Sequence, residues 1–139
     1  MNAGRQDRAT PYRGKVTLDY APEADSDPDP GEVVWAWVPF QEDPSQGKDR
    51  PLLVVGRPEQ GPGYVALMLS SRDRAGEYGW VLLGSGPWDR DGRQSWVKVD
   101  RMLLVHDGGI RREGAVVDGE RFLQVMDKVV REQRGEQLD

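Results

Sequence analysis

An arginine followed by a proline opens an apolar run in this chain, in the stretch GKDRPLLVVGR at residues 47–57. The guanidinium of Arg50 can donate two parallel hydrogen bonds to a phosphate or a carboxylate, and Pro51 restricts the backbone that carries it. The pair therefore predicts one of two things. Either Arg50 is a cation held in place for an anion, or it is an ordinary surface arginine in an ion pair with Asp43 or Asp49.

Two adjacent hydroxyl side chains, Ser70 and Ser71, end a second apolar run at residues 64–71. A hydroxyl can donate a hydrogen bond to a phosphate oxygen or orient a nucleophile. The simpler interpretation is that the two serines end a strand and begin a turn. Three further cations stand beside these two places and would strengthen an anion site, namely Lys48, Arg72 and Arg74.

The chain has one histidine, His106, and no cysteine. A pair of histidines acting as acid and base is therefore impossible within one chain, and so is a metal site made of Cys and His ligands. No tight cluster of Asp and Glu in the sequence predicts a Mg²⁺ site. We expect no metal and no cofactor, and we expect His106 to be structural.

The formal net charge of −5 argues against general binding of polyanions, because nonspecific affinity for nucleic acid comes from Lys and Arg. The acidic excess lies at the two ends of the chain. Residues 1–30 hold four basic and six acidic side chains, residues 113–139 hold four and seven, and residues 31–112 hold eleven of each. A local basic face in the middle of the chain is compatible with this distribution.

A length of 139 residues predicts one domain with its own core. Prolines and acids dominate residues 1–30, which predicts a flexible extension ahead of a domain at 31–135, although residues 13–20 alternate enough for an edge strand. No segment approaches the roughly 18 apolar residues of a membrane span, and the N-terminus has no apolar signal core. We expect a cytoplasmic protein with no membrane partner.

Apolar runs separated by Gly and Pro turns predict a mainly β chain. The run at 31–40 is apolar on both faces and is expected to be central, and Pro51 is expected at the first position of its strand. The one predicted helix, over 118–135, has Asp118 as its N-cap and Gly135 as its stop. Its apolar stripe is Phe122, Val125, Met126 and Val129. The other predicted strands are 50–57, 64–71, 80–86 and 95–106. This pattern favours a small, strongly bent barrel with a C-terminal helix.

Five tryptophans are many for a chain of this length. Trp88 lies in a turn between Pro87 and Asp89, so it is expected to be exposed and able to stack on an unpaired base. The other four lie in apolar strands and are expected to pack in the core: Trp35, Trp37, Trp80 and Trp96.

The ordered segments GEVVWAWVPF, GKDRPLLVVGR and YVALMLSS resemble the PemK/MazF family of toxins from bacterial toxin–antitoxin pairs. The resemblance extends loosely through SWVKVDRMLLV and covers residues 31–130. It implies an SH3-like barrel that forms a homodimer. It also implies metal-independent, sequence-selective cleavage of single-stranded RNA, in which the 2′-hydroxyl attacks the adjacent phosphate and leaves a cyclic phosphate and a 5′-hydroxyl. A separate antitoxin protein is the implied partner.

The resemblance also implies roles for individual residues. The catalytic arginine of the family maps onto Arg50, and the hydroxyl residue, usually Thr, maps onto Ser70. Some members carry a Glu five residues before the arginine, where this chain has Ser45. The general base is then either a nearby loop carboxylate, Glu42 or Asp43, or absent, with the arginine acting mainly as an electrostatic clamp. The residues expected to bind the substrate are Lys48, Ser71, Arg72, Arg74 and Trp88.

Two other functions stay open at this point. A non-catalytic SH3-like binding module would keep the fold and lose the activity, as the missing loop Glu suggests. Inhibition of DNA gyrase is known among toxins that share this fold, and nothing in these residues separates a gyrase-binding surface from an RNA groove.

Overall fold

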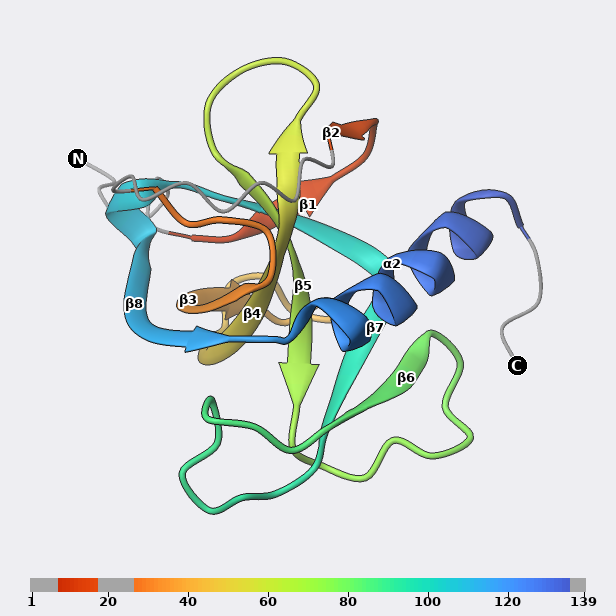
Figure 1. Cartoon of the computed structure of the whole chain (residues 1–139). Coiled ribbons are helices and arrows are strands. Elements are labelled where there is room, and N and C mark those ends of the chain that lie inside the picture. Colours follow the sequence, from red (N-terminus) through yellow and green to blue (C-terminus); the bar gives the residue numbers. More distant parts are fainter. Residues whose placement is uncertain (1–7, 18–26, 136–139) are drawn as a thin grey trace.

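A strongly bent antiparallel sheet with one helix packed against it makes up the computed structural model, which describes residues 8–17 and 27–135 (Figure 1). The elements are β1 Thr10–Tyr12, β2 Val16–Thr17, β3 Glu32–Pro39, β4 Gly47–Pro58, β5 Tyr64–Ser70, β6 Trp80–Gly84, β7 Ser95–Val105, the 3₁₀ turn Asp107–Gly109, β8 Ile110–Val116 and α2 Gly119–Gln133. The prediction of a mainly β chain with a C-terminal helix is confirmed.

The strands follow the order β1-β7-β5-β4-β3-β8, with β2 paired to β4 and β6 paired to β7. In the described part of the chain the two end strands, β1 and β8, do not pair with each other, so the sheet is bent without being a closed barrel. A single bridge joins Arg8 to Trp37, where the backbone N–H of Ala9 donates to the Trp37 carbonyl at 2.9 Å. The segment before β1 therefore reaches across to β3.

Apolar side chains lie on both faces of the central strands, because strand residues alternate between faces. The larger cluster lies between the sheet and α2 and includes Leu53, Leu67 and Phe122. The other cluster lies on the opposite face and includes Leu52 and Leu103. The prediction that residues 31–40 form a central strand is confirmed, since β3 pairs with both β4 and β8.

The strand that carries Arg50 begins earlier than predicted. β4 starts at Gly47, so Pro51 lies inside the strand and the prediction that it takes the first position is wrong. Pro51 is opposite Trp35 of β3, whereas the ladder with β5 begins only at Leu52. One side of this stretch therefore has no neighbouring strand, and such an edge accepts a residue that lacks an N–H.

Three strands near the sheet edges were not predicted as they occur. β8 carries three charged side chains in the sequence IRREGAV, which hides its strand character. β1 lies inside the proline-rich extension and pairs with β7. β2 is the described part of the edge strand expected at 13–20. Residues 8–17 thus join the sheet, while residues 18–26 lie outside the described residues. The division into an extension and a domain stays a prediction.

The tryptophans predicted for the core do not reach it fully. Trp37 is 42% exposed, and Trp35, Trp80 and Trp96 are half-buried, so the prediction is wrong for Trp37 and only partly met by the others. Val33 and Val34 belong to different clusters because successive residues of a strand face opposite sides of the sheet. Trp35 and Trp37 then follow Val33 along β3, past the part of that face that the larger cluster covers.

The C-terminal helix agrees closely with its prediction. The Asp118 side chain accepts a hydrogen bond from the Arg121 backbone N–H at 3.1 Å, as an N-cap does, and Gly135 follows the helix with a positive φ of 75°. The buried residues are those of the predicted stripe, namely Phe122, Val125, Met126 and Val129. Among the described residues no helix is both long enough and apolar enough to cross a bilayer.

Tyr64 begins β5 with its ring buried and its hydroxyl paired. The hydroxyl donates to Asp107 Oδ1 at 2.9 Å, and the Arg57 guanidinium lies 4.9 Å from the ring centroid. Burial, and then the Asp107 carboxylate, raise the pKa of Tyr64 to about 12. Folding therefore favours the neutral phenol over the phenolate.

The helix stripe predicts unequal costs for two neighbouring substitutions. Phe122→Ala removes a ring that is 3% exposed, and we expect a loss of about 3–5 kcal/mol in the free energy of unfolding, because the cavity cannot fully collapse. Leu123→Ala changes a side chain that is 68% exposed and should cost about 0.5 kcal/mol or less. Urea unfolding of both variants measures the difference. Equal losses would mean that α2 does not pack through this stripe.

The raised pKa of Tyr64 predicts a loss of stability at alkaline pH. The folded pKa lies above the unfolded value of roughly 10, so the contribution is complete below pH ~10 and is lost as the pH rises towards 12. The effect is on the order of 2 kcal/mol. Tyr64→Phe cannot ionise. The difference in the free energy of unfolding between the wild type and this variant, measured by urea unfolding, should therefore shrink as the pH rises from ~10 to 12. Parallel pH profiles for the two proteins would contradict this assignment.

Candidate functional site

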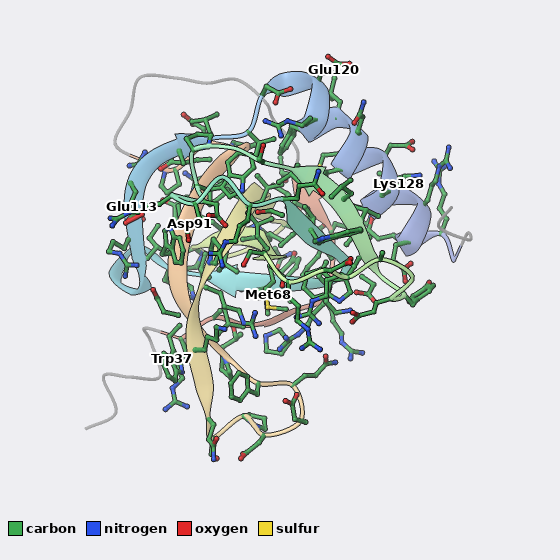
Figure 2. All side chains as sticks on the ribbon, turned by 90° about the horizontal axis from the view of Figure 1, so that it is seen from below. Trp37, Met68, Asp91, Glu113, Glu120 and Lys128 are labelled. Atoms are coloured by element: carbon green, nitrogen blue, oxygen red, sulfur yellow. The ribbon has the colours of Figure 1, made fainter. Side chains whose placement is uncertain are left out.

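A groove of about 980 Å³ opens at the end of β5, between the strands and the loops that follow β5 and β6. The seven residues that the sequence singled out all line it: Lys48, Arg50, Ser70, Ser71, Arg72, Arg74 and Trp88. Asp91 and Glu113 also line the groove, and Figure 2, which views the molecule from below, shows both on the left side of the molecule. The sheet therefore brings together residues that lie far apart along the chain.

Arg50 and Ser70 meet where two neighbouring strands separate. Leu52 of β4 is opposite Met68 of β5, and the same register carried outward by two residues brings Arg50 opposite Ser70. The β4–β5 ladder has ended by then, while β5 continues along β7 as far as Ser70, which is opposite Trp96. Beyond the end of this ladder, Arg50 and Ser70 both line the groove.

The guanidinium of Arg50 is half-buried among other cations. Burial lowers the pKa of Arg50, the charges of Arg74 and Arg101 lower it further, and only Glu42 acts in the opposite direction. An ion pair with Asp49 or Asp43 is not formed: Asp49 accepts from Arg111 at 2.9 Å, and Asp43 accepts from the Ser45 hydroxyl at 2.6 Å. Within the described residues Arg50 has no ion pair, so a bound anion would relieve an unfavourable local charge.

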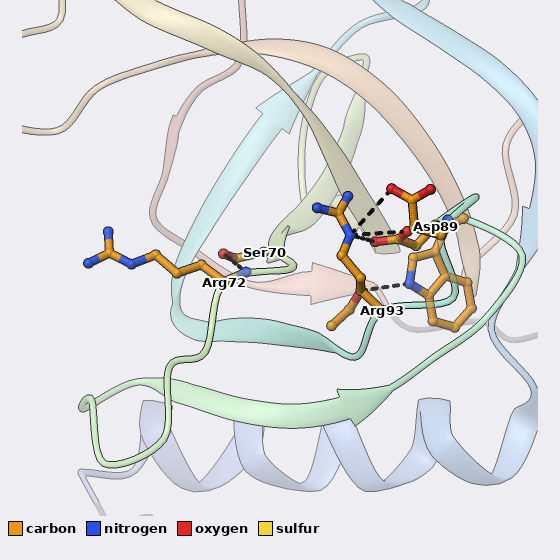
Figure 3. Close-up of polar contacts among 7 residues, drawn as sticks. Ser70, Arg72, Asp89 and Arg93 are labelled. Carbon is orange, nitrogen blue, oxygen red and sulfur yellow. Dashed lines mark hydrogen bonds and ion pairs between the residues drawn. The ribbon is translucent and has the colours of Figure 1, made fainter.

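The hydroxyl of Ser70 is buried and already accepts two hydrogen bonds. The backbone N–H of Arg72 donates to it at 3.2 Å, and Nε of Arg74 donates at 3.3 Å. Neither bond uses the proton of the hydroxyl itself, which is left to donate. Figure 3 shows the Arg72 side chain extending away from Ser70 and from the pair formed by Asp89 and Arg93.

Arg74 is held in the groove by three contacts. Besides Ser70, it contacts Glu77 at 3.3 Å, and its guanidinium lies 4.6 Å from the centroid of the Trp80 ring. A cation stacked on an aromatic face and paired with a carboxylate loses little further freedom when an anion binds. Arg74 therefore positions the Ser70 hydroxyl as much as it contributes charge.

Trp88 is 5% exposed, so the prediction that it is exposed is wrong. Its Nε1 donates to the Ser95 hydroxyl at 2.9 Å, and the ring lies against Gly86, where a Cβ would overlap it. The absence of a side chain at Gly86 lets the indole fold back under its own loop. The ring then has no open face for stacking on a base, and its role in the groove wall is to hold the loop.

Asp89 stabilises the same loop with a carboxylate that is 6% exposed. It accepts from the Asp91 backbone N–H at 2.9 Å and from Nε of Arg93 at 3.0 Å (Figure 3). Arg93 is thus paired inside the groove wall. Arg90, which comes from the same loop, lines the groove and has no ion pair within the described residues.

The sequence did not single out several residues that line the groove. Trp35 was assigned to the core, and Arg111 stands on β8, which was not predicted. The density of arginines at residues 90–93 was the available signal for Arg90 and Arg93. With these added, seven basic and four acidic side chains line the groove of a chain whose net charge is −5.

Every carboxylate that lines the groove already has an arginine partner. Asp49 and Glu113 contact Arg111 at 2.9 and 3.9 Å. Asp89 and Asp91 contact Arg93 at 3.0 and 3.9 Å. The loop acids considered as a general base, Glu42 and Asp43, are not among the lining residues. Among the described residues, no group of three or more His, Asp or Glu side chains could hold a metal ion.

Comparison with known proteins assigns this arrangement to a family. A family model described as "PemK-like, MazF-like toxin of type II toxin-antitoxin system" matches residues 29–132, which run from just before β3 almost to the end of α2. No curated protein matches the chain. Because the matched residues make up most of the chain and include every strand that lines the groove, the chain belongs to the family of PemK-like, MazF-like toxins of type II toxin–antitoxin systems.

Proposed function

We propose that this protein is an endoribonuclease toxin that cleaves single-stranded RNA in the groove between β4 and β5. One observation carries the proposal: four cations line the groove and have no ion pair within the described residues. They are Lys48, Arg50, Arg72 and Arg90. A cluster of unpaired cations is costly without an anion, and an RNA backbone supplies one negative charge for each nucleotide.

The chemistry needs a cation where charge develops. When the 2′-oxygen bonds to phosphorus and the bond to the 5′-oxygen breaks, the 2′-hydroxyl loses a proton, the 5′-oxygen gains one, and the phosphoryl oxygens carry extra negative charge in between. Arg50 can donate two hydrogen bonds to these oxygens from a site that is already partly dehydrated. Its strand holds it in position before the substrate arrives.

Ser70 acts beside Arg50 as a hydrogen-bond donor to a phosphoryl oxygen. Its oxygen is held by Arg72 and Arg74, so its own proton can point towards the substrate. Arg50 acts chiefly as an electrostatic clamp, because the carboxylates that line the groove are all engaged by arginines. The remaining unpaired cations bind the phosphates on either side of the cleaved bond.

The family supplies the biological setting of the proposal. Toxins of type II pairs are neutralised by an antitoxin protein, and we propose the same for this chain, together with a homodimer and a cytoplasmic location.

A binding module without catalysis is the second candidate function. It is favoured by Ser45, which stands where some members carry Glu and whose hydroxyl is bound to Asp43. In that case the same cations would bind RNA without cleaving it. Cleavage and binding must therefore be measured separately.

The proposal predicts cleavage of a mixed-sequence single-stranded RNA in EDTA, with cyclic-phosphate product ends. Arg50→Ala should lower the rate by about 10²–10³-fold, the usual cost of losing one donor to a developing charge. Ser70→Ala should also slow cleavage, whereas Ser70→Thr keeps the hydroxyl and should retain activity. Mass spectrometry of the products identifies their ends.

Arg57→Ala is the matched control, because Arg57 lies on the same strand but outside the groove. It should cleave RNA like the wild type, and the melting temperatures of all variants should stay close to that of the wild type. RNA binding without cleavage by the wild type would favour the binding module. Cleavage that survives Arg50→Ala would show that the wrong arginine has been assigned.

A further inference from the structure

A second cavity, of about 630 Å³, lies beside β1 and the loop between β3 and β4. We call it the N-terminal pocket, since Arg8, Thr10 and Arg13 line one of its sides. Phe40, from the end of the β3 segment, lies on another side. None of its lining residues is among those of the groove described above.

The side of this pocket built by residues 8–13 lies outside the family match, which begins at residue 29. The segment is fixed to the sheet by the β1–β7 ladder and by the hydrogen bond from Ala9 to Trp37. Ala9 is 1% exposed, so the segment is packed in place. One side of the pocket is therefore built by residues outside the matched family domain, and the rest by residues inside it.

The pocket combines unpaired cations with apolar surface. Lys98 is paired with Asp100 at 2.8 Å, but Arg8, Arg13 and Arg101 have no ion pair within the described residues. Its apolar lining includes Pro11, Pro39, Phe40, Pro44 and Met102. Such a composition suits a ligand that carries negative charges at intervals together with flat apolar groups.

The pocket and the groove are joined by cationic side chains. One cation from each cavity contacts the Trp80 ring: Arg74 of the groove lies 4.6 Å from its centroid and Lys98 of the pocket 5.4 Å from it. Arg101 of the pocket is close enough to Arg50 for its charge to lower the pKa of Arg50. A polyanion could therefore pass from one cavity to the other while in contact with positive charge.

We propose that the N-terminal pocket is a subsite for RNA, which holds nucleotides of the strand beyond the groove. Arg8, Arg13 and Arg101 bind phosphates there, and the apolar lining, with Phe40, contacts a base. The proposal rests on the proposed function of the groove and extends it, because the segment before the family match then determines how much RNA the protein recognises. Continuity with the groove favours RNA over an acidic peptide, which the charge alone would also suit.

The test uses the full chain and a series of 2′-O-methyl RNA oligonucleotides, which bind without being cleaved because the attacking hydroxyl is blocked. Their lengths span on the order of 4–16 nucleotides. Wild-type affinity, from fluorescence anisotropy, should rise with length. In Arg8→Glu/Arg13→Glu the rise should disappear for the longer oligonucleotides, while the affinity for the shortest stays within about twofold. The salt slope of the longest should fall by about 1.4, which corresponds to two lost phosphate contacts.

Lys15→Glu/Lys128→Glu is the matched control, because it makes the same charge change at side chains outside both cavities. It should keep the length dependence of the wild type. If both double variants lost the length dependence of affinity equally, the effect would come from net charge alone, and the proposed subsite would be wrong. A peptide rich in Asp and Glu, titrated in parallel, provides the other arm: if the arginine variant loses this peptide but keeps its affinity for long RNA, the pocket is a peptide site.

Cleavage of a short RNA with free 2′-hydroxyls separates this proposal from the previous one. Wild type and both double variants should cleave it at similar rates, since the groove is unchanged. Absence of cleavage in all three would defeat the proposed nuclease, while the length dependence of binding would still decide whether the pocket binds RNA.

Discussion

The candidate site depends on one constraint, which is that β4 is not paired with β5 at the residues that precede Leu52. From Leu52 onward β4 is a buried strand paired with β5, whereas residues 47–51 form an edge paired only with β3. The change from inner strand to edge lets Pro51 sit within a strand and exposes Arg50 to a groove while its backbone stays paired with Ala36. Had the ladder continued, Arg50 and Ser70 would have been a cross-strand pair with no space between them for a substrate.

Charge pairing around the groove divides the arginines into two groups. Arg93 and Arg111 are occupied by the four carboxylates of the lining, and Arg74 is held by Glu77 and Trp80. These paired residues shape the walls and leave the other cations without partners. A protein of net negative charge can thus have a locally basic groove, because its acidic side chains either lie elsewhere or are paired with Arg93 and Arg111 of the groove.

The sequence was sufficient for the features that local pattern determines. The stripe and N-cap of α2 could be predicted, and the family resemblance singled out Arg50 and Ser70, which the structure places in the same groove. What failed depends on distant partners. Trp88 lies in a polar turn and is buried because Gly86 and Ser95 accommodate it, and Arg111 lies on an edge strand whose charged residues hide its periodicity. Neither the burial of Trp88 nor the strand position of Arg111 can be read from a short window of sequence.

The two sides of the groove are held in different ways, and in the proposed nuclease this difference would separate chemistry from recognition. Arg50 lies within β4 and Ser70 ends β5, and the backbone ladders with β3 and β7 fix them. The opposite wall is a loop held by side chains: Arg121 of α2 donates to the Ser85 carbonyl at 2.8 Å and lies 5.3 Å from the Trp88 ring centroid. Cleavage of any phosphodiester needs the same geometry at phosphorus, so the rigid side suits the reaction. Loop contacts can change with little effect on the sheet, so the loop wall and the N-terminal segment are the places where a preference for particular RNA sequences can reside.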